Sequence, residues 1–260
     1  GGTGFIGYHL AKKAIKKNWI VDSLSINKPK KKRKLKRVKY IQADISRKID
    51  LKKKIKNNYS FVINLGGYVN HVNKKKNFKS HFQGSKNLSQ ILSRKELLTF
   101  IQMGSSGEYG NKKSPHKESF KLKIPKNSYA KSKFLATKYL VNLYKKEKFP
   151  VTILRLYQAY GPEQDTNRII PIVINACLKN KKFPCSNGMQ LRDFVHIDDL
   201  IKCIFLCFNN KKARGNIINV GSGKPVKIKS VINNFSEDNI NGFKKILYEM
   251  IENNNKKTFK

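Results

Sequence analysis

The sequence has 260 residues, 39% of them hydrophobic, and a formal net charge of +40. This length allows one sizeable hydrophobic core with a smaller lobe, and no apolar run approaches the roughly 18 residues of a membrane helix. The charge comes mostly from Lys spread along the chain, whereas nucleic-acid readers favour Arg. The four cysteines form no C-x-x-C pair, which is typical of structural thiols in a reducing compartment. We expect a cytoplasmic globular protein with no membrane, metal or specific nucleic-acid partner.

The chain opens with the heptad Gly1-Gly2-Thr3-Gly4-Phe5-Ile6-Gly7. In dinucleotide-binding sites such a turn follows a buried strand and opens a helix, whose N-terminus offers N–H groups and partial positive charge to phosphates. The helical pattern follows over residues 8–17, but no strand precedes the turn. We interpret the chain as a fragment that lacks the first strand of its sheet. The alternative is a plain turn, since glycine clusters also form turns that bind nothing.

Strand and helix patterns alternate along the rest of the chain. Apolar runs predict strands at 20–25, 38–41, 61–65, 100–103 and 151–156, and amphipathic runs predict helices at 50–56, 79–92 and 129–146. This alternation predicts an α/β fold with a doubly wound parallel (Rossmann) sheet. We expect residues 1–162, with segments near 194–220, to form a dinucleotide-binding domain. Residues 163–193 and 221–260 are expected to form a smaller, incomplete substrate-binding lobe.

Tyr129 and Lys133 are four residues apart on the predicted helix 129–146, so they project from one face. An unperturbed tyrosine hydroxyl titrates at about pH 10 and is a poor base at neutral pH, but an ammonium one turn away stabilises the phenolate. The tyrosine can then exchange a proton with a carbinol oxygen. A hydroxyl at a neighbouring strand end, from Ser105 or Ser106, can hydrogen-bond the same oxygen.

The Tyr-x-x-x-Lys spacing is weak by itself in so Lys-rich a chain. It also occurs at Tyr109–Lys113 and at Tyr144–Lys148. The alternative is an amphipathic helix on which Lys133 is solvated. The position of Tyr129 and Lys133 after the glycine turn and the Ser-bearing strand end favours the catalytic interpretation.

In this order the motifs resemble the extended short-chain dehydrogenase/reductase family, the NAD-dependent epimerase/dehydratases of nucleotide sugars. The resemblance runs from Gly1 to about Val231. After the heptad it is carried by Asp44-Ile45, Leu65-Gly66-Gly67, Gly104-Ser105-Ser106 with Tyr109-Gly110, Pro125-x-x-x-Tyr129-x-x-x-Lys133, Leu154-Arg155 with Tyr160-Gly161-Pro162, residues 192–200 and residues 219–223. It implies an NAD- or NADP-dependent enzyme with a nucleotide-sugar substrate, assembled as a homodimer. A fragment of it is not expected to act as an enzyme alone.

The resemblance also implies cofactor contacts at several matching positions. The pyrophosphate would lie on the opening turn, against Gly1, Gly4, Phe5, Ile6 and Gly7. Asp44 and the Ile45 amide would bind the adenine, while Leu65 and Gly66 would line the ribose. Tyr129 would be the acid/base, and Lys133 would be its partner and would bind the nicotinamide ribose.

Arg192 would contact the diphosphate of the sugar nucleotide, which suits a bidentate guanidinium. The alternative for Arg192-Asp193 is an internal ion pair. Gln158 stands where the family usually has Asn and is expected near the substrate. Asp198 and Asp199 are interpreted as residues at the start of a helix, where acidic side chains need no catalytic role.

The end of the second strand departs from the family pattern. An acidic residue is expected there to bind the adenosine ribose, but Ser25 takes its place, followed by Asn27 and Lys28. Without that carboxylate a 2′-phosphate is not repelled, and the nearby Lys favours it. We therefore favour NADP over NAD, with Asp22 as the rival ribose ligand.

The active-site turn departs as well. Family dehydratases carry a hydroxyl followed by two acidic residues. If the sequence is aligned without a gap, Ser105 is the hydroxyl residue and Gly107 replaces the second acidic residue. If one deletion is allowed, Ser106 is the hydroxyl residue and Glu108 is the acidic residue expected to contact the substrate. A single carboxylate disfavours dehydration, so we expect an epimerase or a 4-keto reductase. The alternatives are a dehydratase and a noncatalytic dinucleotide-binding relative.

Overall fold

The computed structural model describes residues 1–55, 58–68, 73–179 and 181–234. These divide into two compact units. The larger unit comprises Gly1–Leu156 and Leu200–Val220, and the smaller unit comprises Tyr157–Asp199 and the described residues 221–234. Helix α7 (Ile197–Asn209) runs from one unit into the other.

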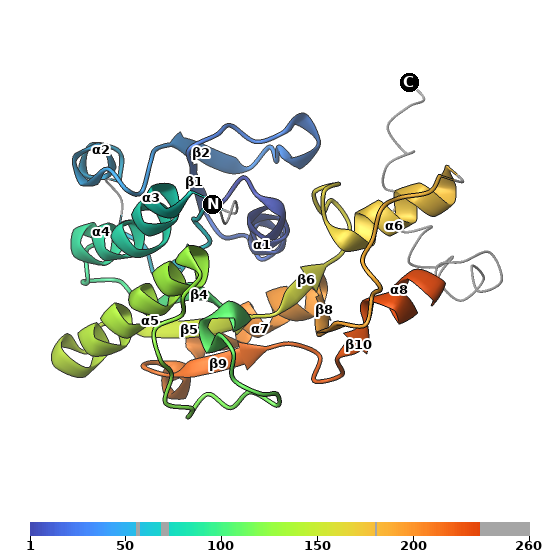
Figure 1. Ribbon diagram of the computed structural model, residues 1–260. Coiled ribbons are helices and arrows are strands. Elements are labelled where there is room, and N and C mark those ends of the chain that lie inside the picture. Colours follow the sequence, from blue (N-terminus) through green and yellow to red (C-terminus); the bar gives the residue numbers. More distant parts are fainter. Residues whose placement is uncertain (56–57, 69–72, 180, 235–260) are drawn as a thin grey trace, which may run out of the picture. The chain divides into compact units, whose positions relative to one another are not determined.

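Parallel strands form the centre of the larger unit (Figure 1). The strands are β1 (Val21–Ser25), β2 (Val38–Gln42), β3 (Phe61–Asn64), β4 (Thr99–Ser105), β5 (Val151–Leu156) and β9 (Ile217–Val220). β1 pairs with β2, and the others pair in the order β3-β4-β5-β9, all in parallel. Helix α1 (Phe5–Lys16) precedes β1. The helices that follow are α2 (Lys48–Lys54), α3 (Lys74–Asn77), a π-helical segment (Phe78–Gln83), α4 (Gly84–Ile91) and α5 (Ser128–Glu147). The predicted α/β fold with a parallel sheet is confirmed.

Apolar side chains on the two faces of these strands pack against different helices. One core joins Leu51 of α2 and Leu140 of α5 to Phe100 and Val151, and Val62 packs against it. The neighbouring residue on β3, Phe61, stacks on Trp19 after α1 with ring centroids 5.0 Å apart and contacts Phe208 of α7. Because successive residues of a strand point to opposite faces, helices cover both sides of the sheet.

The strands β1 and β3 form no hydrogen-bonded pair with each other among the described residues. An apolar cavity of about 190 Å³ is lined by residues of both strands, by α1 and by Trp19 and Phe208. The Gly1 backbone nitrogen, which lines this cavity, donates to the carbonyl oxygen of Leu24 at 2.9 Å. The larger unit therefore contains two parallel sheets separated by an apolar space.

The smaller unit is built from short strands and two helices. β6 (Gln158–Tyr160) pairs with β8 (Phe194–His196) in parallel, and β7 (Leu191–Arg192) pairs with β10 (Val226–Lys227) in antiparallel. The helices are α6 (Ile169–Leu178) and α8 (Ile228–Asn234). A small core centred on Val173 of α6 holds them together.

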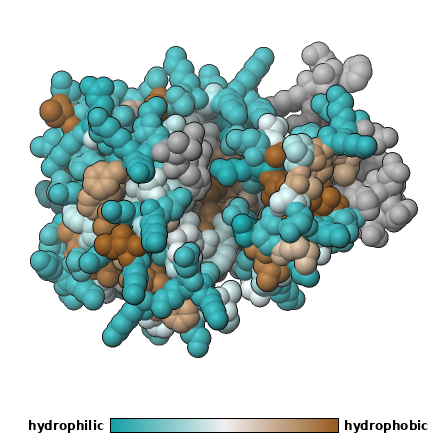
Figure 2. Space-filling model, viewed as in Figure 1, coloured by the Kyte–Doolittle hydropathy of each residue, from teal (hydrophilic) through white to brown (hydrophobic). Residues whose placement is uncertain are grey.

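Most of the lysines that the structure describes are exposed, and hydrophilic residues cover much of the face shown in Figure 2. Of the lysines that the structure describes, Lys133 is the only one in the buried class; its relative exposure is 5%. In the described ranges, none of the helices combines the length and the apolar character needed to cross a bilayer.

Candidate active site

The opening glycine turn lies against the ends of β1 and β3. The Gly2 N–H donates to the carbonyl oxygen of Leu24. A Cβ atom at Gly7 would collide with the carbonyl of Gly2, and one at Gly1 would collide with the carbonyl of Leu65. α1 begins at Phe5, with Gly4 as an N-cap that has no side chain to bind the first N–H groups. These N–H groups and the bare backbone fit a pyrophosphate.

The residues expected to bind adenine and ribose follow the ends of β2 and β3. One carboxylate oxygen of Asp44 accepts from the Ser46 N–H at 2.8 Å, which fixes the turn after β2. Ile45 is buried. The Gly66 N–H donates to the Asn64 side chain at 3.0 Å, so the backbone at Leu65 and Gly66 is held close to the glycine turn.

Sequence analysis missed a buried polar network beneath this edge. The Asn64 amide nitrogen donates to Ser85 at 3.0 Å and to Gln102 at 2.9 Å, and all three side chains are at most 4% exposed. A buried amide needs such partners. The available signal was an Asn and a Gln inside otherwise apolar strand patterns.

Lys133 is held inside the protein one helical turn after Tyr129. α5 is capped by Asn127, whose side chain accepts from the Tyr129 N–H at 3.0 Å. The Lys133 ammonium donates to the carbonyl oxygen of Met103 in β4 at 2.6 Å. The half-buried Tyr129 ring packs at right angles to the His81 ring, with centroids 5.0 Å apart. The alternative of a solvated Lys133 is therefore wrong.

The three other Tyr-x-x-x-Lys matches, one of which is Tyr8–Lys12, differ in burial. Lys12, Lys113 and Lys148 are all exposed. The Lys148 ammonium lies over the ring of Tyr144, 5.6 Å from its centroid. Only the match at Tyr129 combines a partly buried tyrosine with a lysine fixed in the interior.

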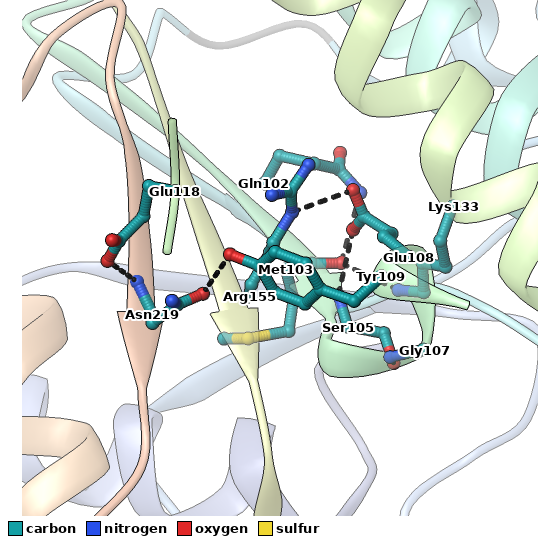
Figure 3. Close-up of polar contacts among 10 residues, drawn as sticks. All are labelled: Gln102, Met103, Ser105, Gly107, Glu108, Tyr109, Glu118, Lys133, Arg155 and Asn219. Atoms are coloured by element: carbon teal, nitrogen blue, oxygen red, sulfur yellow. Dashed lines mark hydrogen bonds and ion pairs between the residues drawn. The ribbon is translucent and has the colours of Figure 1, made fainter. Parts of the chain in front are cut away.

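Ser105 is the last residue of β4, two residues after the carbonyl that Lys133 binds. Its hydroxyl oxygen accepts from the Gly107 N–H at 3.1 Å. A serine oxygen that accepts in this way keeps its own O–H for donation. Ser106 instead begins the 3-10 helix Ser106–Tyr109. Lys133 and Ser105 thus come to the same end of β4 (Figure 3).

The structure does not support the predicted contact between Glu108 and a substrate. The side chain is fully buried. One carboxylate oxygen accepts from the Ser105 N–H at 2.9 Å, and the other lies 3.1 Å from the Arg155 Nε (Figure 3). Both oxygens are therefore used inside the protein.

The end of β1 carries Ser25, which is partly buried. The rival ribose ligand Asp22 lies three residues earlier, and its carboxylate accepts from the Tyr59 hydroxyl at 2.8 Å. Burial and this hydrogen bond raise the pKa of Tyr59. Asp22 is thus engaged away from the strand end at which a ribose is expected.

In the smaller unit, Gln158 and Arg192 line one cavity of about 280 Å³. Arg192 is exposed and donates to the carbonyl of Leu191. Its neighbour Asp193 accepts instead from the N–H groups of Ser222 and Gly223, at 2.6 and 2.9 Å. Arg192 and Asp193 therefore do not form the internal ion pair that was the alternative interpretation. Acidic residues occupy the first turn of α7, as expected.

Comparison with known proteins adds to this geometry. Residues 1–221 match the model of the NAD-dependent epimerase/dehydratase family. The chain belongs to this family. The resemblance predicted from the motifs is confirmed.

Relatives within the epimerase/dehydratase family differ in the reaction they are named for. The chain is 29% identical over 252 residues to a dTDP-D-glucose 4,6-dehydratase of Dictyostelium discoideum, a match that covers 85% of this chain and 57% of the relative. It is 31% identical over 153 residues to an ADP-L-glycero-D-manno-heptose-6-epimerase of Brachyspira hyodysenteriae, covering 56% and 48%. The matches thus span about half the length of these relatives.

A solved structure confirms the fold. The dTDP-glucose 4,6-dehydratase of Bacillus anthracis in complex with NAD superimposes with a TM-score of 0.78 and 19% identity, covering 90% of this chain and 78% of that chain. At this identity the similarity shows the fold and leaves the reaction of this family member to be inferred from its own residues.

Proposed function

We propose that this protein is an NAD(P)-dependent epimerase or 4-keto reductase that acts on a nucleotide sugar. The observation that carries the proposal is the burial of Lys133. Among the described lysines it alone is buried, and it is tied to the strand that ends at Ser105 and lies one turn from Tyr129. Burying an ammonium costs free energy, so a functional role is the simplest reason for it.

The proposed chemistry assigns each side chain one task. Ser105 donates its hydroxyl hydrogen to the carbinol oxygen of the sugar and holds that oxygen near Tyr129. Tyr129 takes the carbinol proton during oxidation and returns it during reduction, while the Lys133 ammonium stabilises its phenolate. The bound nicotinamide cofactor supplies the hydride acceptor and donor.

The environment of Glu108 supports an epimerase or reductase over a dehydratase. Dehydration at C5 and C6 requires a base for the carbon proton and an acid for the departing hydroxyl. The one carboxylate of the turn Ser105–Gly110 is fully buried against Arg155. Epimerisation and 4-keto reduction need only the tyrosine and the hydride, which this site offers.

We also propose which residues bind the phosphate groups of the cofactor and of the substrate. The backbone N–H groups at the start of α1 would hold the cofactor pyrophosphate, as described for the glycine turn. Arg192 and Gln158 would hold the diphosphate of the sugar nucleotide, since a guanidinium binds phosphate in a bidentate manner. The cavity of about 280 Å³ that both residues line supports this assignment.

A substrate screen tests the proposed function. The full-length protein is incubated with UDP-, GDP-, dTDP- and CDP-sugars and with NAD, NADP or their reduced forms, and the products are analysed by mass spectrometry and NMR. The proposal predicts an epimer of unchanged mass or, for a 4-keto sugar, a product two hydrogens heavier. Loss of water would instead indicate a dehydratase. No product with any sugar, despite cofactor binding, would indicate a noncatalytic dinucleotide-binding protein.

A further inference from the structure

A buried ion pair lies directly beneath the active-site turn, and the proposed chemistry does not use it. Glu108 and Arg155 are 0% and 3% exposed, and their charged atoms are 3.1 Å apart. A buried ion pair is often no more stable than an apolar pair of the same volume. Stability therefore does not explain why these two charges lie at this position.

The geometry of the carboxylate suggests a different role. One oxygen accepts from the Ser105 N–H at 2.9 Å and the other accepts from Arg155, so Glu108 links the end of β4 to β5. A Cβ atom at Gly104 would lie only 2.6 Å from the first oxygen, so the carboxylate reaches back over a residue that has no side chain. Glu108 thus holds the backbone of Ser105, the residue whose hydroxyl takes part in the proposed reaction.

This link requires that both side-chain oxygens of residue 108 accept a hydrogen bond. An ionised carboxylate has two acceptor oxygens, whereas an amide has one acceptor and one donor group. A glutamine at position 108 would leave either the Ser105 N–H or the Arg155 Nε–H facing a donor. Two acceptor oxygens, and not merely a side chain of this length, are therefore needed at position 108 to hold Ser105.

Arg155 is itself anchored on the far side of the turn. Its guanidinium lies over the ring of Tyr109, 4.7 Å from the centroid. The Tyr109 ring stacks on His116, and its hydroxyl donates to the side-chain oxygen of Asn219 in β9 at 2.8 Å (Figure 3). The contacts extend from β4 through β5 to β9, so the side chains that hold Ser105 are themselves fixed to the sheet.

We propose that Glu108, held by Arg155, is a positioning residue that fixes Ser105 for proton and hydride transfer at the sugar. This inference rests on the proposed function, in which Ser105 binds the carbinol oxygen. Glu108 touches neither substrate nor cofactor in this account. It acts through Ser105, and small misplacements of a reacting group lower rates steeply.

The first test is Glu108→Gln in the full-length protein, assayed with a nucleotide sugar that the screen identifies. We expect kcat to fall about 10- to 100-fold, while KM for the sugar and the Kd of the cofactor stay within about threefold. Glu147→Gln is the matched control, because Glu147 also pairs with an arginine, Arg94, at 2.6 Å but is exposed. The control should keep the wild-type kcat. A Glu108→Gln enzyme with unchanged kcat would overturn the proposal.

A double-mutant cycle asks whether Glu108 acts through Ser105. In a Ser105→Ala background, Glu108→Gln should lower kcat by less than about threefold, because the group it positions is already absent. If the fold-losses in kcat of the two single variants multiply in full in the double variant, Glu108 contributes independently of Ser105. That result would contradict the proposal.

A second variant guards against a protein that fails to fold. Glu108→Leu with Arg155→Leu removes both charges together, which proteins tolerate far better than the loss of one partner. It should keep a cooperative melt, lose kcat to the same extent and show faster amide hydrogen exchange at residues 105–109. Unchanged exchange in this segment would overturn the positioning role. Because exchange needs no substrate, this readout remains decisive even if the screen finds no turnover and the proposed function fails.

Discussion

The burial of Lys133 distinguishes one Tyr-x-x-x-Lys match in this protein from the others. Four Tyr-x-x-x-Lys matches occur, at Tyr8, Tyr109, Tyr129 and Tyr144, and burial distinguishes the one at Tyr129, because Lys133 is fixed on the Met103 carbonyl. Sequence spacing can propose such a pair, since i and i+4 residues share a helix face. It cannot report burial, which depends on β4 lying beside α5.

At the same scale, Ser25 governs the proposed preference for NADP. Replacing Ser25 with Asp places a carboxylate at the end of β1, where it would repel a 2′-phosphate and accept from ribose hydroxyls. We expect the Kd for NADP to rise about tenfold or more and the Kd for NAD to fall. Fluorescence titration of both cofactors measures this. Ser119→Asp, on an exposed turn, should change neither, and a wild-type protein that binds NAD more tightly than NADP would refute the preference.

Glu108 shows why residue roles are harder to predict than residue types. The sequence offers one acid in the turn after β4, and the family pattern suggests a substrate contact. Its partner Arg155 is 47 residues further along the chain, and no local pattern joins the two. The carboxylate points into the protein because the pairing of β4 with β5 places Arg155 beside it.

Most elements of the larger unit could be predicted because they are long and periodic. The strand predicted at 151–156 is β5, and the helix predicted at 129–146 is α5 with one more residue at each end. The helix predicted at 79–92 begins earlier, at Lys74, and passes through a π-helical segment. The strands of the smaller unit have two or three residues each, too few for a hydrophobic period to emerge.

At the scale of elements, the glycine turn and α1 should bind the cofactor as one unit. Gly7→Ala adds a methyl group that collides with the Gly2 carbonyl and pushes the turn away from the helix. We expect cofactor affinity to fall about tenfold or more, as measured by titration. Lys13→Ala, on the exposed side of α1, is the control and should bind normally. Full affinity in Gly7→Ala would show that the pyrophosphate does not lie on this turn.

For the whole chain, the division of the larger unit into two sheets should limit stability. The cavity between β1 and β3 measures about 190 Å³, and the apolar side chains that line it lack packing partners across this space. Because the total stability of a domain is only about 5–15 kcal/mol, lost packing of this kind should lower it noticeably. Calorimetry of residues 1–260 should therefore show a broad transition at low temperature. A sharp melt with equal calorimetric and van't Hoff enthalpies would contradict this.

The most direct test of the whole account is Tyr129→Phe in the full-length protein, with turnover of the identified nucleotide sugar and cofactor affinity measured side by side. Removing one hydroxyl should abolish turnover, a loss of at least about a thousandfold, and leave the Kd of the cofactor nearly unchanged. Tyr144→Phe, on the same helix with an exposed lysine four residues on, should turn over normally. Unchanged turnover in Tyr129→Phe would contradict the assignment of this site.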